Sequence, residues 1–302
     1  MKATRAAWVP LLVALLVVVL WGGTPTVTKL AAREIDPLVI AFTRTLVGAL
    51  AALPLVLAMR VAPPRSLRLA WPLVLSGICA FVAFPILFTY GQRHTSAMHG
   101  GLILAVLPVM TGLYAAVVER RWPISRWWLG CTIALAGEAL LIGGKGHGAE
   151  QEATLFGDVL IVLSCLFASL SYVLGARLAQ AGYPSLGTTL WSLIASGILL
   201  LPGIPWVLGG GLPEATPLAW GSVFFLAVIT SILGYIGWYW ALGAGGIARI
   251  ATLQFMQPIS GLVLAFFLLG ERPTLVLGIA TLVILAGVVI AQGRRSARSG
   301  AR

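Results

Sequence analysis

Apolar residues run along this chain in stretches of about 20, separated by short turns that carry Pro, Gly and charged residues. A helix needs about that length to cross a bilayer. Strands of a membrane barrel would instead alternate apolar and polar residues over about 10 positions, and the chain lacks that alternation. We therefore predict an all-α membrane protein of ten transmembrane helices, at Trp8–Leu30, Pro37–Met59, Leu69–Tyr90, Thr95–Val118, Ser125–Ile142, Leu155–Ala179, Pro184–Leu208, Pro217–Leu242, Gly245–Leu269 and Thr274–Gln292.

The pattern repeats within the chain, with matching positions about 150 residues apart: Pro108 with Pro258, Pro123 with Pro273, and Gly137 with Gly287. A period of this size in 302 residues indicates an internal duplication. Each copy holds five predicted helices, an odd number, so the second copy must enter the membrane from the opposite side. We predict inverted five-helix repeats at 8–142 and 155–292, an external linker at 143–154, and a basic cytoplasmic tail at 293–302.

Most lysine and arginine residues lie in segments on the same side of the membrane as the N-terminus. The opposite side carries only five of the 20 basic residues: Lys29, Arg33, Arg93, Lys145 and Arg272. Cytoplasmic loops are enriched in Lys and Arg, so we predict that both termini are cytoplasmic. No cleavage site follows the first apolar run, which we expect to remain as a helix of a multi-pass protein in the inner (cytoplasmic) membrane.

The composition excludes a water-soluble domain, because 59% of residues are hydrophobic and only 10% are charged. The net charge of +11 follows from the loop arginines, and no basic surface suited to nucleic acid is evident. Membrane lipid is therefore the expected surrounding partner. We find no P-loop, zinc spacing or nucleophile elbow, so we predict no catalytic residue, no cofactor, no metal site and no enzyme activity.

Charged residues inside predicted helices need a reason, since burying one in hydrocarbon costs at least about 2.5–3.5 kcal/mol. Arg44, in the second helix, is predicted to line a hydrated cavity and bind a carboxylate. Glu138, in the fifth, has a similar depth and is a candidate coupling residue. A structural Arg44–Glu138 pair or snorkelling of Arg44 is the alternative. His99, in the fourth, is predicted to face a polar cavity and contact the substrate; ordinary packing is the alternative.

Polar side chains also accompany the two repeated prolines. Gln254 and Gln257 precede Pro258, and Tyr114 follows Pro108. A proline frees a carbonyl one turn earlier, which polar side chains or water can satisfy. We predict two bent helices that face a hydrated centre, with Gln254, Gln257 and Tyr114 contacting substrate. Two tolerated kinks packed in protein are the alternative.

Aromatic residues gather on the third and eighth predicted helices. Tyr90 closes the outer end of one, and Tyr239 closes the inner end of the other. Inverted symmetry makes these residues counterparts, so we assign them to an outer and an inner gate, with Trp238 beside Tyr239. Trp21, in the first helix, is assigned to substrate stacking. Packing or an interfacial aromatic belt is the alternative for this set.

Several motifs resemble the EamA family of the drug/metabolite transporter superfamily. In the first half these are Trp21–Pro25, Arg44 after Pro37, Gly91–Ala97 and Leu107-Pro108; in the second they are Gln257-Pro258 and Gly270–Pro273. The resemblance extends from about Trp8 to Gln292. The first half departs from the usual Gly-Glu-Arg turn, having Glu119-Arg120-Arg121-Trp122 there.

Within that superfamily the chain is most similar to the YddG-type amino acid exporters. This resemblance implies ten helices, a central cavity between the halves, peripheral fifth and tenth helices, and export of aromatic and other apolar amino acids. We expect a secondary transporter that works by alternating access. Another metabolite (nucleobase, sugar or organic cation) is the alternative substrate, and a membrane enzyme or scaffold is a remote alternative. The sequence leaves two oligomeric states open, a monomer and a homodimer. It also leaves two driving forces open, facilitated diffusion and proton exchange.

Overall fold

The computed structural model describes residues 8–94, 100, 103–143, 154–257, 259–261, 263 and 275–292, with the backbone alone at 138, 141–143, 276–277 and 292. This described part is helical and contains no strand, as predicted. Its α-helices are α1 (Val9–Gly22), α2 (Thr24–Ala32), α3 (Pro37–Ala58), α4 (Leu67–Gly77), α5 (Phe84–Arg93), α7 (Val106–Glu119), α8 (Ser125–Gly143), α9 (Leu155–Gln180), α10 (Ser185–Leu200), α11 (Ile204–Val207), α12 (Pro217–Phe224), α13 (Tyr235–Gly245), α14 (Ile247–Ala251) and α16 (Leu275–Gln292).

Several helices begin at an Asp or Thr residue whose side chain accepts a hydrogen bond from the first turn, as the sequence indicates. Asp36 precedes Pro37 and its carboxylate accepts a hydrogen bond from the backbone N–H of Leu38 at 2.8 Å, which begins α3. The hydroxyl of Thr154 accepts one from Gly157 N–H at 3.1 Å and begins α9. Thr216 caps α12 in the same way, with Pro217 as its first helical residue. These caps set the boundaries between turn and apolar helix.

Six helical stretches in the described part are long and apolar enough to cross a membrane: Val9–Ala32, Pro37–Ala58, Leu67–Arg93, Leu155–Gln180, Ser185–Val207 and Pro217–Gly245. Each coincides, within a few residues at its ends, with a stretch predicted from hydropathy. Helices α14 and α16 lie within two of the other four predicted ranges, and α7 and α8 each extend one residue beyond the end of theirs. The chain is therefore a multi-pass membrane protein.

Two of the long stretches contain a π-helical segment, at Ile78–Ala83 and at Phe225–Gly234. The first joins α4 to α5 and the second joins α12 to α13, so each lies within the third or eighth predicted helix. The backbone hydrogen bonds of a π-helix join residues five apart, one more than in an α-helix, so the regular α-helical bonding pattern is interrupted there. Such segments are common at functional sites, and hydropathy does not reveal them.

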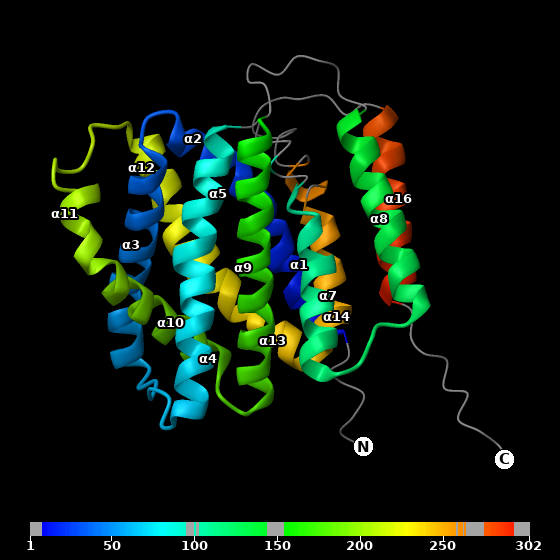
Figure 1. Cartoon of the computed structure of the whole chain (residues 1–302), viewed down its shortest axis with the longest axis horizontal. Coiled ribbons are helices and arrows are strands. Elements are labelled where there is room, and N and C mark those ends of the chain that lie inside the picture. Colours follow the sequence, from blue (N-terminus) through cyan, green and yellow to red (C-terminus); the bar gives the residue numbers. More distant parts are fainter. Residues whose placement is uncertain are drawn as a thin grey trace.

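Helices from the first half of the chain pack against helices from the second half. These pairs include α1 with α13, α3 with α10, α5 with α9, α7 with α14, and α8 with α16. Figure 1 shows α8 and α16 side by side, apart from the rest of the bundle. Glycine allows their close approach: a Cβ at Gly137 would lie 2.9 Å from the backbone nitrogen of Ile284.

Candidate functional site

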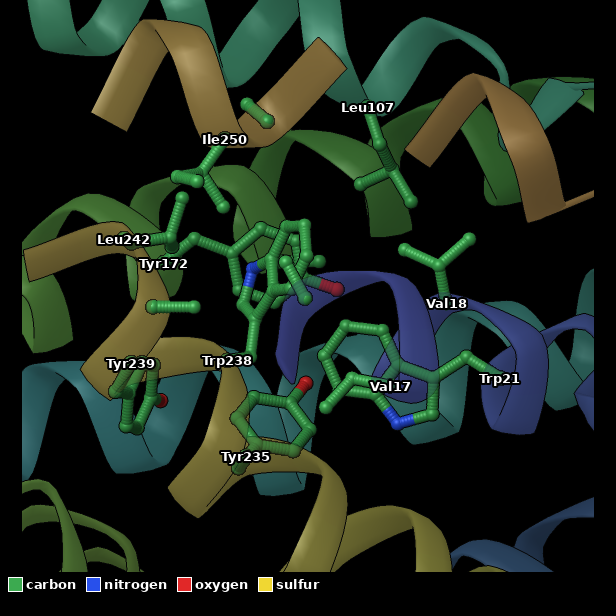
Figure 2. Close-up of a cluster of buried hydrophobic side chains, with 14 of the residues drawn as sticks. Val17, Val18, Trp21, Leu107, Tyr172, Tyr235, Trp238, Tyr239, Leu242 and Ile250 are labelled. Atoms are coloured by element: carbon green, nitrogen blue, oxygen red, sulfur yellow. The ribbon is translucent and has the colours of Figure 1, made fainter. Parts of the chain in front are cut away.

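Four aromatic rings meet in the middle of the main bundle. Trp21 of α1 stacks on Tyr172 of α9, with ring centroids 5.7 Å apart and an interplanar angle of 16°. Tyr235 and Trp238 of α13 contact both of these rings at 5.2 to 6.0 Å. All four are at most 4% exposed. Figure 2 shows their rings converging, and we call Trp21, Tyr172, Tyr235 and Trp238 the aromatic cluster.

Arg44 lies on α3 close to this cluster, and its side chain is 3% exposed. Its Nε donates a hydrogen bond to Ser231 Oγ, and its Nη2 donates one to Thr230 Oγ1, both at 3.2 Å. Among the described residues no carboxylate pairs with Arg44. The guanidinium is therefore a buried cation held by neutral oxygen atoms, which is an expensive arrangement without an anion.

The π-helical segment makes those neutral acceptors available. Thr230 Oγ1 and Ser231 Oγ both donate to the carbonyl of Leu226, at 2.6 Å and 2.9 Å. A hydroxyl has one hydrogen and two lone pairs, so both hydrogens are used and the lone pairs face Arg44. The backbone carbonyl of Thr230 accepts a further bond from Trp21 Nε1 at 3.1 Å. Arg44 and Trp21 of the aromatic cluster therefore both bond to the π-helical segment Phe225–Gly234.

The two predicted glutamines occupy different surroundings. Gln254 is 1% exposed, and neither atom of its amide has a hydrogen-bond partner among the described residues. It lies next to Tyr172 of the aromatic cluster. Gln257 instead donates from Nε2 to the carbonyl of Trp21 at 3.4 Å, so it holds α1. Gln254 thus has the Tyr172 hydroxyl as its polar neighbour but makes no well-formed hydrogen bond to it, whereas Gln257 positions a cluster residue.

Three hydroxyl groups form a second buried constellation, which we call the hydroxyl ring. Tyr239 Oη lies 2.9 Å from Ser76 Oγ and 2.7 Å from Ser171 Oγ, and the two serine oxygens are 3.1 Å apart. These residues come from α13, α4 and α9 and are fully buried. The Tyr239 ring also contacts Tyr235 at 5.4 Å. The hydroxyl ring therefore joins three helices next to the aromatic cluster.

Hydrogen bonds connect the two halves of the chain near Glu34, just before the first residue of α3. We call this region the Glu34 end. Glu34 accepts hydrogen bonds from the backbone N–H and the hydroxyl of Thr216, at 2.7 Å and 2.8 Å. These two bonds lower the pKa of the Glu34 carboxyl below its usual value. Nearby, Asp36 pairs with Arg93 at 3.2 Å.

The opposite end of α3, which we call the Val61 end, is tied by aromatic donors. Tyr183 donates from its hydroxyl to the carbonyl of Ala62 at 3.0 Å, and Trp191 donates from Nε1 to Val61 at 3.2 Å. Burial raises the pKa of the Tyr183 hydroxyl to about 12, so it stays a donor at neutral pH. Both ends of the interface between the halves therefore carry hydrogen bonds in this structure.

The remaining predicted residues of the described part lie outside the aromatic cluster. Tyr90, near the end of α5, and Tyr114, on α7, are half-buried. Pro108 is buried but is only the third residue of α7, where a missing N–H costs no internal helix bond. Pro108 thus lies in the first turn of α7, and the Leu107 carbonyl beside it accepts a hydrogen bond from the Ser169 hydroxyl at 3.2 Å.

His99, Pro258 and the side chain of Glu138 lie outside the described residues. The backbone of Glu138 belongs to α8, which Figure 1 places on the opposite side of the bundle from α3. The helix arrangement therefore offers no support for the Arg44–Glu138 pair that their similar depths suggested. The position of α8 beside α16 is peripheral to the aromatic cluster.

Sequence reasoning missed Tyr172, Ser76, Ser171, Thr230 and Ser231. Tyr172 could have been found from the repeat. The sequence offset between Pro37 and Pro184, applied to Trp21, leads to a position about one helical turn before Tyr172. The serines and the threonine had no such signal, since single hydroxyl residues are common in apolar helices and usually bond their own backbone. Their partners come from helices distant in sequence.

Two segments of the chain match one family profile. The EamA-like transporter family matches residues 8–143 and again residues 155–292. The chain belongs to the EamA-like transporter family. This confirms the resemblance seen in the sequence motifs, and it identifies the bundle around Arg44 and the aromatic cluster as that of a transporter.

Several relatives align over nearly the whole EamA chain. The uncharacterized transporter YdeK of Bacillus subtilis (strain 168) is 26% identical over 275 residues, covering 90% of this chain and 92% of that protein. An uncharacterized transporter of Archaeoglobus fulgidus is 25% identical, with 93% and 96% covered. A probable terminal-alkyne amino-acid exporter of Streptantibioticus cattleyicolor is 24% identical, with 99% and 97% covered.

The fold is also similar to that of a solved structure described only as a crystal structure of a protein. The TM-score is 0.74 at 18% sequence identity, and the match covers 95% of this chain and 99% of the other. At that identity the likeness concerns the fold alone. The helical bundle is thus an arrangement that another protein adopts along its full length.

Proposed function

We propose that this EamA protein is a secondary transporter of the inner membrane that exports aromatic and other apolar amino acids by alternating access. The observation that carries the proposal is Arg44, a buried guanidinium held by neutral hydroxyls beside four aromatic rings. A site with a cation next to a large aromatic surface suits a ligand with a carboxylate at one end and an apolar group at the other.

Each part of such a ligand has a partner in the described residues. The carboxylate accepts from the donor fork of Arg44, the apolar side chain packs on the aromatic cluster, and the amide of Gln254, which lies beside the Tyr172 hydroxyl, serves the polar remainder. The aromatic rings also attract an ammonium group. The relative from Streptantibioticus cattleyicolor, whose name describes an amino-acid exporter, supports this substrate class.

The packing of the helices supports ten membrane-spanning helices in two inverted repeats. The predicted repeat exchanges the first helix with the sixth and the third with the eighth. Here α1 belongs to the first predicted helix, α5 to the third, α9 to the sixth and α13 to the eighth. The exchange therefore turns the contact of α1 with α13 into that of α9 with α5, and the bundle contains both contacts. The pairs α3 with α10, α7 with α14 and α8 with α16 each map onto themselves. A pseudo-two-fold axis relating the halves accounts for all five pairs.

Close contacts also support termini on one side of the membrane. A Cβ at Gly245 would lie 3.1 Å from Pro10, near the start of α1. Trp127 Nε1 donates to the carbonyl of Ala248 at 3.1 Å, and Gly130 packs on Ala291, near the end of α16. The start of α1 and the end of α16 therefore share the Val61 end, which the basic loops assign to the cytoplasm.

Alternating access then requires the two ends to open in turn. The hydroxyl ring lies in the half of the bundle nearer the Val61 end, and we assign it to the inner gate with Tyr239 as its centre. The Glu34 bonds to Thr216 close the outer end, where Tyr90 is also placed. Both sets of bonds join helices of different repeats, so rocking of one repeat against the other breaks one set at a time.

The test is a counterflow assay with the full-length protein in proteoliposomes. Liposomes loaded with unlabelled phenylalanine should accumulate radiolabelled phenylalanine, tryptophan and leucine, whereas protein-free liposomes should not. Counterflow needs no assumption about proton coupling. Accumulation of a labelled sugar, nucleobase or organic cation instead would replace the substrate class, and absence of all exchange would leave an enzyme or scaffold.

A further inference from the structure

We infer that Thr230 and Ser231 hold the place of the ligand carboxylate on Arg44 while the transporter is empty. A bound carboxylate exchanges for the two hydroxyls and thereby releases the π-helical segment Phe225–Gly234 of the second repeat from Arg44 on α3. The inference rests on the proposed function in one respect, that the ligand carries a carboxylate. It assigns positioning and coupling roles to two residues that touch Arg44.

The geometry of the guanidinium carries the first step. The nitrogens used, Nε and Nη2, each donate one hydrogen bond at 3.2 Å to a separate hydroxyl oxygen. A guanidinium presents two parallel N–H groups to the two oxygens of one carboxylate in a bidentate pair. The oxygens of Ser231 and Thr230 thus occupy two acceptor places that a carboxylate can take.

The charges decide which partner Arg44 prefers. Both hydroxyls are neutral, and their hydrogens are held by the Leu226 carbonyl, so they offer lone pairs without a negative charge. A carboxylate supplies the missing charge in the same buried place, where charge-assisted bonds are strongest. An amide, an alcohol or an ammonium group supplies none, so a ligand without an anionic group leaves the hydroxyls in place.

The same contacts explain how exchange reaches the rest of the protein. Arg44 lies on α3 in the first half, whereas Thr230 and Ser231 lie in the π-helical segment Phe225–Gly234 of the second. Thr230 also accepts from Trp21 Nε1 through its backbone carbonyl. Release of Arg44 therefore removes a contact between the repeats at the same segment whose backbone holds Trp21 of the aromatic cluster.

The first arm of the test needs no ligand. In the empty full-length protein in nanodiscs, the double variant Thr230→Val with Ser231→Ala should label Cys79 with N-ethylmaleimide at least about tenfold faster, because two charge-assisted bonds are lost. Cys79 is buried in the other π-helical segment and lies near Tyr235. Mass spectrometry reads each cysteine separately, and Cys131 on peripheral α8 is the internal control.

Two variants separate this effect from loss of any buried hydroxyl. Ser222→Ala removes a serine of α12 that donates to its own helix at 2.8 Å without touching Arg44, and it should label like the wild type. Thr230→Ser keeps the acceptor and should also label like the wild type. Equal labelling of Cys79 in the double variant and the wild type would overturn the inference.

The second arm uses the wild type, so it does not depend on the variant folding. Phenylalanine and 3-phenylpropionate, which carry a carboxylate, should raise Cys79 labelling toward the level of the double variant, whereas phenylalaninamide should not. An equal effect of the amide would overturn the inference. If 3-phenylpropionate acts but no amino acid is exchanged in counterflow, the inference stands and the proposed function fails. If amino acids are exchanged but the double variant labels like the wild type, the proposed function stands and the inference fails.

Discussion

Replacement of Arg44 by methionine should separate stability from transport. Methionine fills a similar volume without a charge, so it removes both hydrogen bonds and the cost of burying the cation. Thr230 and Ser231 keep their bonds to Leu226 and lose only a donor. We expect Arg44→Met to fold at least as well as the wild type and to lose transport of carboxylate ligands.

The magnitudes follow from the contacts of the guanidinium. Two hydrogen bonds from a charged donor contribute about 1.5–3 kcal/mol each. Burial of an ion costs several kcal/mol, and replacing buried ionic groups by packed apolar residues is often neutral or stabilising by about 1–4 kcal/mol. Loss of a bidentate carboxylate contact of about 3 kcal/mol should lower kcat/KM by about 100-fold.

Thermal unfolding of the detergent-solubilised protein and counterflow of phenylalanine measure the two effects side by side. The matched control is Arg93→Met, which breaks the exposed 3.2 Å pair with Asp36 and should change either quantity little. A large fall in melting temperature for Arg44→Met with transport intact would refute the reasoning, because Arg44 would then be a structural residue.

Two further predictions concern packing and pH. Gly175→Ala should destabilise the protein by about 1–3 kcal/mol in thermal unfolding, because its Cβ would lie 2.6 Å from Tyr239 Cγ; Gly221→Ala, with open space before it, should not. The Glu34 carboxyl has a lowered pKa in the folded protein, so its bonds to Thr216 stabilise the protein above its unfolded pKa of about 4.3. That stabilisation should be lost as pH falls through the lower folded pKa, and the difference in melting temperature between wild type and Glu34→Gln should shrink over the same interval. A difference that is constant from neutral to acid pH would contradict this account.

Much of the helix arrangement could be read from the sequence because the bilayer imposes a length and a polarity on each helix. The six long apolar helical stretches of the described part begin and end near the predicted positions, with visible caps such as Asp36 and Thr216. A charged residue in an apolar run is expensive, so Arg44 could be selected as a candidate. Trp21 and Trp238 could be selected as aromatic candidates inside apolar helices, and the structure brings both into one cluster.

The sequence by itself determined the class of the protein, its apolar helices and its family, because hydropathy and motif spacing are local properties of the chain. Only the tertiary structure decided which polar groups meet. Tyr172 reaches Trp21 from a helix about 150 residues away, and Arg44 bonds hydroxyls that are 186 and 187 positions distant. Local pattern carries no information about such pairs, since a serine that bonds its own helix and one that faces a buried arginine look alike until the helices are packed.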